Sequence, residues 1–120
     1  MRVRCLRIID AIDGKVETDS AWLRVGREYT VLAISAFGGR VLLRIASDEA
    51  GVPALFQAEM FEVVDSRLPS SWRATLEQSG GLDIGPDAWL QAGFWEDYFN
   101  DAPEAVAIYE RERAAIEAAP

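Results

Sequence analysis

The chain has no histidine, one cysteine and one lysine among its 120 residues. The lack of histidine removes the commonest general base, the commonest zinc ligand and the usual partner of a catalytic serine. Cys5 has no second thiol for an internal disulfide, so we expect it to be a small buried side chain. Lys15 follows Gly14 in a turn-like stretch, which does not suit a desolvated Schiff-base lysine. We therefore predict a protein that is not an enzyme and that uses no cofactor and no metal.

Long apolar runs are also absent, because none approaches the roughly 18 residues that a membrane-spanning helix needs. The segment Met1–Arg4 leads into an alternating pattern rather than the unbroken apolar stretch of a signal peptide. Half of the residues are apolar, which favours a folded chain over disorder. We expect one domain over residues 1–120, a cytoplasmic location and no membrane partner.

Acidic residues are concentrated in the second half of the chain. Residues 1–60 contain eight basic and eight acidic residues, whereas residues 61–120 contain four and twelve, so the net charge of −8 belongs to the second half. A field of that sign repels nucleic acid and anionic lipid and attracts basic protein surfaces. We expect a basic protein partner and no nucleic acid.

Residues 1–65 have the pattern of a small β-structure. In Val3–Asp10 the apolar positions change phase after Cys5, which is typical of a bulge or of a strand covered on both faces. Tyr29–Ile34 is rich in β-branched and aromatic residues and predicts a central strand, and Phe37–Gly39 suits a tight hairpin. Further strands are expected at Val41–Ile45, Leu55–Phe56 and Phe61–Val64. About five short strands at this spacing predict a small antiparallel barrel.

Two arginines follow the predicted hairpin. Arg40 and Arg44 alternate with apolar residues along one strand. We expect both arginines to face solvent or an acidic partner, because successive side chains of a strand point to opposite faces.

Residues 66–120 are predicted to be mainly helical. Gln78–Gly81 has the composition of a flexible break, and Leu82–Ile84 is expected to add an edge strand. Gly85–Asp87 places a proline and then an acid at the start of a short helix. Asp101–Glu104 has the form of a capping box, so we expect the last helix to begin there and to end near Ala118.

One carboxylate interrupts the apolar side of that last helix. If the helix packs along its whole length, Glu112 needs an arginine or a backbone donor, because an unpaired buried charge is costly. The alternative, which we favour, is that the last turns extend past the body of the protein and that Glu112 is hydrated.

The run Phe94–Phe99 carries four aromatic rings at helical spacing. On a helix, Phe94, Trp95, Tyr98 and Phe99 share an arc of roughly 140°, whereas the two acids between them point the other way. We interpret this aromatic run as a structural latch that clamps a helix onto the preceding chain. The alternative is an aromatic pocket for a ligand.

The candidate site is a surface of carboxylates spread through consecutive helical segments. These candidate residues are Asp83, Asp87, Glu96, Asp97, Asp101, Glu104 and Glu110. They form either a partner-binding acidic patch or a solvated face that confers solubility. As a catalytic pair, the neighbours Glu96 and Asp97 diverge by about 100° on a helix and so do not converge on one substrate bond. The acids around Asp83 also lack the ligand spacing of a calcium loop.

Four segments of the chain resemble a set of small, largely uncharacterised bacterial proteins. The segments are Tyr29–Leu32, Leu55–Phe56 with Phe61–Asp65, Leu68–Trp72 and Phe94–Phe99. The likeness covers most of the chain from about Trp22 to Tyr109. In these segments the chain is similar in style to immunity proteins of bacterial toxin systems, including those of contact-dependent inhibition. The resemblance implies an α+β fold, with an SH3-like barrel followed by C-terminal helices, and it carries no functional residue across.

Three functions are open on these grounds. We favour an immunity-type protein that inhibits a basic toxin, with a nuclease as the expected kind, by covering its active site with the acidic helical half. The second is a regulatory or scaffold module that binds a peptide at an exposed strand edge of the barrel. The third is a small enzyme that uses Glu96 and Asp97. Affinity that falls steeply with salt favours the first over the second. Neither the partner's identity nor the oligomeric state follows from the sequence.

Overall fold

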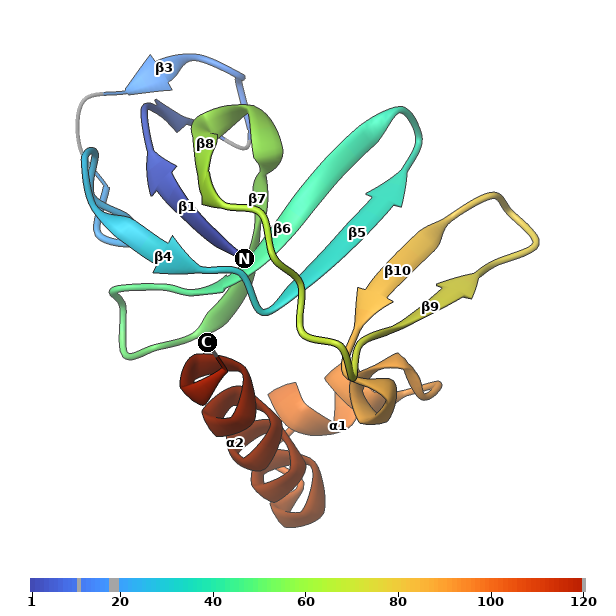
Figure 1. Cartoon of the computed structure of the whole chain (residues 1–120). Helices are drawn as coiled ribbons and strands as arrows, with labels where there is room; N and C mark the ends of the chain where they lie inside the picture. The colour runs from blue at the N-terminus through green and yellow to red at the C-terminus, as the bar shows by residue number, and fades with distance from the viewer. Residues whose placement is uncertain (11, 18–19, 120) are drawn as a thin grey trace.

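A computed structural model describes residues 1–10, 12–17 and 20–119 as antiparallel sheets with a C-terminal layer of helices (Figure 1). The strands are β1 (Arg2–Cys5), β2 (Ile8–Ile9), β3 (Val16–Glu17), β4 (Glu28–Thr30), β5 (Ala33–Phe37), β6 (Arg40–Ala46), β7 (Pro53–Gln57), β8 (Phe61–Asp65), β9 (Arg73–Leu76) and β10 (Leu82–Gly85). The helices are the 3-10 turns η1 (Ala58–Met60) and η2 (Asp87–Leu90), and the α-helices α1 (Phe94–Phe99) and α2 (Pro103–Ala118). The fold class is therefore α+β, as the sequence predicted.

The described strands form three sheets and no closed barrel. Their orders are β4-β1-β8, β7-β6-β5-β10-β9 and β2-β3. The chain passes from the first sheet into the second through Val31 and Leu32, which separate β4 from β5 and are buried. The backbone N–H of Val31 donates to the carbonyl of Met1, and that of Leu32 donates to the carbonyl of Arg44. One extended segment thus ties the first sheet to the second.

The five-stranded sheet has one apolar face and one polar face at its centre. Leu43 and Ile45 on β6 are buried in the core. Arg44 points to the opposite face because side chains alternate along a strand. In the same register Arg44 lies opposite Ala33, and Asp83 lies opposite Ser35, so these four residues share the polar face. This face carries the pocket described below.

The core joins the sheets and the helices in one cluster. It contains Val3 and Cys5 from β1, Tyr29 from β4, and Met60 from η1, together with large side chains of the helices. Cys5 is fully buried, as its lack of a thiol partner predicted. The largest of the fully buried side chains is Tyr109 of α2, which is 1% exposed. Burial of these apolar side chains is the main source of stability for a domain of this size.

Four local predictions for the strands need correction. Tyr29–Ile34 is not one central strand, because Val31 and Leu32 separate β4 from β5. Val3–Asp10 forms two short strands, β1 and β2, with the break after Cys5 where the apolar pattern changes phase. Leu82–Ile84 belongs to β10, which is an inner strand between β5 and β9 rather than an edge strand. The turn between these last two strands contains Gln78–Gly81, so the expected flexible break is a hairpin, and residues 66–120 contain two strands as well as helices.

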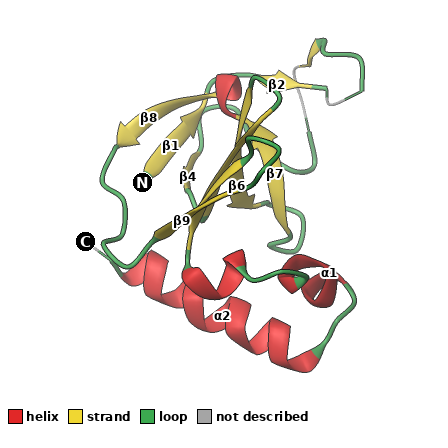
Figure 2. Ribbon diagram, turned by 90° about the vertical axis from the view of Figure 1, so that its right-hand side faces the viewer, coloured by secondary structure: helices red, strands yellow, loops and turns green. Residues whose placement is uncertain are grey.

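The helices η2, α1 and α2 form a single layer below the sheets, which we call the helical layer, whereas η1 lies at the other end of the molecule (Figure 2). η2 contacts β9 and β10, and α1 packs on α2. The predicted ends of both α-helices are confirmed, but the predicted capping box is wrong. Ala102 is the N-cap of α2, no side chain caps that end, and Asp101 has a left-handed φ of 59°. The N–H of Asp101 donates to the carbonyl of Tyr98, so this residue ends α1 instead.

Glu112 is half-buried in the C-terminal half of α2 rather than fully hydrated. Its Oε1 accepts a hydrogen bond from Nη2 of Arg111 at 3.2 Å. The first alternative for Glu112 required an arginine or a backbone donor as its partner. Arg111 is that partner.

Candidate functional site

The helical layer carries six of the seven predicted acidic residues, and all six are exposed. They are Asp87 on η2, Glu96 and Asp97 on α1, Asp101 between the α-helices, and Glu104 and Glu110 on α2. Asp83 is the exception, because it lies in β10 and is half-buried. We call the six exposed residues the helical acids.

The helical acids are spread over the layer and are not one tight cluster. Ala105, Tyr109 and Ile116 form the buried side of α2. Glu104 and Glu110 are six residues apart, so at 100° per residue they are about 120° apart around the axis, one on each flank of the exposed side. A partner that met both would therefore have to wrap around α2 or to approach it from its outer side.

The ion pairs of the described residues use other carboxylates. They are Arg2–Glu28, Arg4–Glu28, Arg4–Glu62, Arg27–Asp48, Arg67–Asp65, Arg111–Glu112 and Arg113–Glu117. Four of these pairs lie on the sheets or their loops, within residues 1–62. Across residues 1–10, 12–17 and 20–119, none of the helical acids has a basic nitrogen within 4.0 Å. Their charge is thus exposed and not paired within this part of the chain.

An aromatic cluster lies directly beneath these acids and holds η2, α1 and α2 together. The ring centres of Trp89 and Tyr109 are 5.3 Å apart, those of Tyr98 and Tyr109 are 4.7 Å apart, and those of Trp89 and Phe94 are 6.4 Å apart. Such ring pairs add stability beyond the apolar area that they bury. The latch interpretation thus holds for these rings, whereas Phe99 is 53% exposed and packs at the rim.

Two of the acids influence the aromatic cluster electrostatically. Burial raises the pKa of the Tyr98 hydroxyl, and the carboxylates of Glu110 and Asp101 raise this pKa further, while Arg113 opposes them. Those two acids therefore lie on the side of the layer where Tyr98 reaches the surface.

Arg44 does not face solvent or an acidic partner, as the sequence predicted, but is half-buried under α1. Its guanidinium carbon lies 3.8 Å from the centre of the Trp95 ring. Its Nη1 donates to the backbone carbonyl of Pro53 at 2.8 Å. Burial lowers the pKa of Arg44 to about 10, although Tyr109 and Asp83 act in the opposite direction. Arg44 is thus a partly desolvated cation without a carboxylate in ion-pair contact among the described residues.

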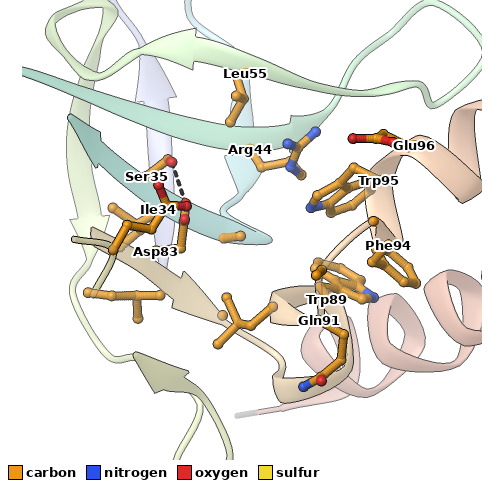
Figure 3. Close-up of a pocket in the computed structure, with 17 residues that line it drawn as sticks. Ile34, Ser35, Arg44, Leu55, Asp83, Trp89, Gln91, Phe94, Trp95 and Glu96 are labelled. Carbon is orange, nitrogen blue, oxygen red and sulfur yellow. Dashed lines mark hydrogen bonds between the residues drawn. The ribbon is translucent and has the colours of Figure 1, made fainter. Parts of the chain in front are cut away.

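A pocket of about 250 Å³ opens between the polar face of the sheet and the helical layer (Figure 3). Arg44 and Trp95 form one side, and the hydrogen-bonded pair of Ser35 and Asp83 forms the other. In this hydrogen bond Oγ of Ser35 donates to Oδ1 of Asp83. Figure 3 shows the indole nitrogen of Trp95 directed toward the middle of the pocket. The pocket therefore offers the donors of Arg44 and Trp95, with the carboxylate of Glu96 beside them, on one side and the carboxylate of Asp83 on the other.

Some of the residues that line this pocket are recognisable from the sequence. Asp83 and Glu96 were singled out as acids, and Trp95 as part of an aromatic run, and all three line the pocket. Arg44 was the residue that sequence reasoning placed wrongly. The alternation of side chains along a strand shows on which face of the sheet an arginine lies. It does not show which other element covers that face.

The other candidate chemistries gain no site from the structure. Glu96 lines the pocket, while Asp97 is exposed outside it, so the two acids do not converge. In the described ranges, no three Cys, Asp or Glu side chains gather closely enough to hold a metal ion. Nor do these ranges contain a helix with the length and apolar character needed to cross a membrane.

Comparison with known proteins does not add to these observations. No family model, no curated protein and no solved structure matches the chain. The function must therefore be inferred from the geometry and charge of the described residues.

Proposed function

We propose that this chain is a non-enzymatic acidic binding protein of the immunity type. It acts in the cytoplasm and neutralises a basic bacterial toxin, with a nuclease as the expected kind, by covering the toxin's active site with its helical layer. The observation that carries the proposal is the exposed position of the six helical acids without a basic partner among the described residues.

The physical basis is electrostatic capture. Exposed charges of one sign on a rigid layer raise the rate at which an oppositely charged surface is met. Toxins that cleave nucleic acid need basic surfaces to hold phosphates, so an acidic layer competes for the same surface. The aromatic cluster keeps the layer rigid, because α1 and α2 share the ring contacts of Tyr98 and Tyr109.

A genetic test with charge-reversed variants decides this proposal. The gene is deleted in its host, and the host is exposed to the toxin-like product of the adjacent gene. We expect the deletion to sensitise the host and the wild-type gene to restore protection. The double variant Asp97→Lys with Glu104→Lys is expected to fail. Unchanged sensitivity after deletion would refute the immunity role.

A matched control separates charge from a general loss of folding. Glu17 and Glu59 are exposed acids on β3 and η1, at the opposite end of the molecule from the helices (Figure 1). The variant Glu17→Lys with Glu59→Lys changes the net charge by the same amount and is expected to protect fully. Equal failure of both double variants would show that net charge, and not the helical layer, is responsible.

A strand edge is the second candidate site. β8 is one of the two edge strands of the three-stranded sheet, and its Val63 is 54% exposed. An extended peptide could add to that edge by main-chain hydrogen bonds. This mode of binding depends little on salt, whereas binding to the helical acids weakens steeply as salt is added. Once a partner is identified, its affinity measured at two ionic strengths distinguishes binding at the strand edge from binding at the helical acids.

The SH3-like barrel is a finer proposal for residues 1–65. It is supported by the continuous passage of β4 into β5, which connects the two main sheets, and by the antiparallel pairing of β1 with both β4 and β8. An experimental structure tests this proposal. If β7 or β2 pairs with the three-stranded sheet in that structure, the barrel is closed.

A further inference from the structure

The pocket beneath Trp95 holds an arginine whose donors are incompletely used. A guanidinium has five N–H groups, and Nη1 of Arg44 makes a hydrogen bond to Pro53. One face of the guanidinium is covered by the Trp95 ring. Because Arg44 has lost part of its water and has no ion pair within the described residues, it favours an added anionic acceptor.

A carboxylate faces this arginine across the pocket. Asp83 on β10 and Arg44 on β6 are separated by β5, and their registers differ by two residues. From strand spacing and rise, their Cα atoms are about 12 Å apart. Figure 3 shows the side chain of Arg44 directed toward Trp95 and away from Asp83, so the space between the guanidinium and the carboxylate is left for a small molecule.

The charges of the lining select among ligand classes. Three acids, Glu77, Asp83 and Glu96, line the pocket, and Arg44 is the one basic residue among its described lining. A dianion such as phosphate meets three carboxylates, and a simple cation meets the half-buried guanidinium of Arg44. A molecule with one carboxylate and one ammonium group matches both sides.

We propose that this pocket binds a small zwitterion of the size of a free amino acid. Its carboxylate accepts hydrogen bonds from Arg44 and from the indole N–H of Trp95, and its ammonium group donates to Asp83, which Ser35 holds in place. At about 250 Å³, the pocket lies just below the range of about 300–1,000 Å³ that is usual for drug-sized ligands, which limits the occupant to a small molecule.

The apolar part of the lining indicates the side chain. Leu55, Leu90 and Trp89 contribute to the pocket wall between its charged sides. An aliphatic amino acid such as L-leucine therefore fits the pocket better than a polar one, because its side chain matches the apolar wall while its charged groups meet Arg44 and Asp83. Glu96 belongs both to the helical acids and to the pocket lining. The proposed ligand is bound by Arg44, Trp95 and Asp83, none of which is a helical acid, so either proposal can fail without the other.

A series of three ligands tests the proposal with the unaltered protein. L-leucine carries both charged groups, isocaproate lacks the ammonium group, and isoamylamine lacks the carboxylate. Binding is followed by calorimetry and by tryptophan fluorescence, since Trp95 and Trp89 line the pocket. We expect L-leucine to saturate the protein with a Kd of about 1 mM or lower and each analogue to bind at least tenfold more weakly. Equal binding of isocaproate, tighter binding of inorganic phosphate, or no saturable signal with L-leucine would overturn the proposal.

Paired variants locate the site. Arg44→Met and Asp83→Asn are each expected to weaken L-leucine binding at least tenfold. Arg40→Met on the same strand and Glu59→Gln on η1 are controls that we expect to bind as the wild type does. If Arg44→Met does not fold, as judged by circular dichroism, Asp83→Asn and the ligand series still decide. Retained binding in a folded Asp83→Asn variant would place the ligand elsewhere.

Discussion

Arg44 of β6 and Trp95 of α1 are in contact, with the guanidinium carbon 3.8 Å from the ring centre. This contact joins the polar face of the five-stranded sheet to the helical layer. A cation over the face of tryptophan is attracted by the negative face of the ring, and more strongly when both groups have lost water. The same pair forms one side of the pocket, so a ligand bound as proposed would contact a pair that also holds the helical layer on the sheet.

Removal of the Trp95 ring is predicted to destabilise the protein much more than removal of its neighbour Phe99. Trp95 contacts the rings of Trp89 and Tyr109 as well as Arg44, whereas Phe99 is 53% exposed. We expect Trp95→Ala to lower the free energy of unfolding by about 3 kcal/mol and Phe99→Ala by about 1 kcal/mol or less. Urea denaturation of both variants measures this difference. Equal losses would mean that the aromatic latch does not depend on Trp95.

Tyr109 is predicted to make the protein less stable at alkaline pH. Burial raises the pKa of its hydroxyl from 10.0 to about 12, although Arg113 lies near enough to favour the ionised form. The native state then holds a proton that the unfolded state has lost between those pH values, so stability falls as pH rises through that window. Arg44 acts with the opposite sign, because burial lowers its pKa to about 10 in the folded state, so its contribution to stability rises with pH above that value.

The variant Tyr109→Phe isolates the tyrosine contribution. Its hydroxyl makes no hydrogen bond of normal geometry among the described residues, so we expect little loss of stability at neutral pH. From about pH 9 to about pH 11 the variant is expected to gain about 1 kcal/mol relative to the wild type. Urea denaturation at both pH values gives this difference. A gap between variant and wild type that does not change with pH would contradict the assignment.

The sequence predicted the helices better than the arrangement of strands, because helix signals are local. The aromatic spacing of Phe94–Phe99 indicated α1, and the capping-box pattern of Asp101–Glu104 indicated where α2 begins, although the box itself does not form. Strand order depends on contacts far apart in sequence, so the inner position of Leu82–Gly85 had no local signal. The capping box failed because Asp101 ends one helix two residues before the next begins, and it takes a left-handed conformation there.

For the candidate sites, the residue types were predictable but their pairing was not. The helical acids could be chosen from charge and helical periodicity alone, and the structure places them in one exposed layer. The contact of Arg44 with Trp95 joins residues 51 positions apart, and the hydrogen bond of Ser35 with Asp83 joins residues 48 positions apart. Such pairs follow from how the sheet and the helices pack together.

Asp65 is predicted to contribute to the loss of stability in acid. Its carboxylate accepts hydrogen bonds from the backbone N–H, Nε and Nη2 of Arg67, and these hold the pKa of Asp65 well below its usual range. A group with a lowered folded pKa stabilises the protein above its unfolded pKa, and that stability is lost as pH falls. Asp65→Asn should therefore flatten the dependence of stability on pH below about pH 4. Thermal unfolding across that range measures it, with Glu59→Gln as the control variant.

Gly85 is predicted to be required by close packing between β10 and β5. Its φ is not left-handed, but a Cβ atom at this position would lie 3.1 Å from Cβ of Ala33. Both atoms belong to short, rigid side chains next to the backbone, so neither can turn away. We expect Gly85→Ala to lower the free energy of unfolding by about 1–3 kcal/mol.

A compensating substitution distinguishes this crowding from other effects of alanine. Ala33→Gly removes the atom that the new Cβ would meet, so it should cost less stability in the Gly85→Ala background than in the wild type. Urea denaturation of the two single variants and the double variant completes the cycle. Additive losses would show that Ala33 and the alanine at position 85 do not interact. The spacing of β5 and β10, which sets the Ser35–Asp83 side of the pocket, would then not depend on this glycine.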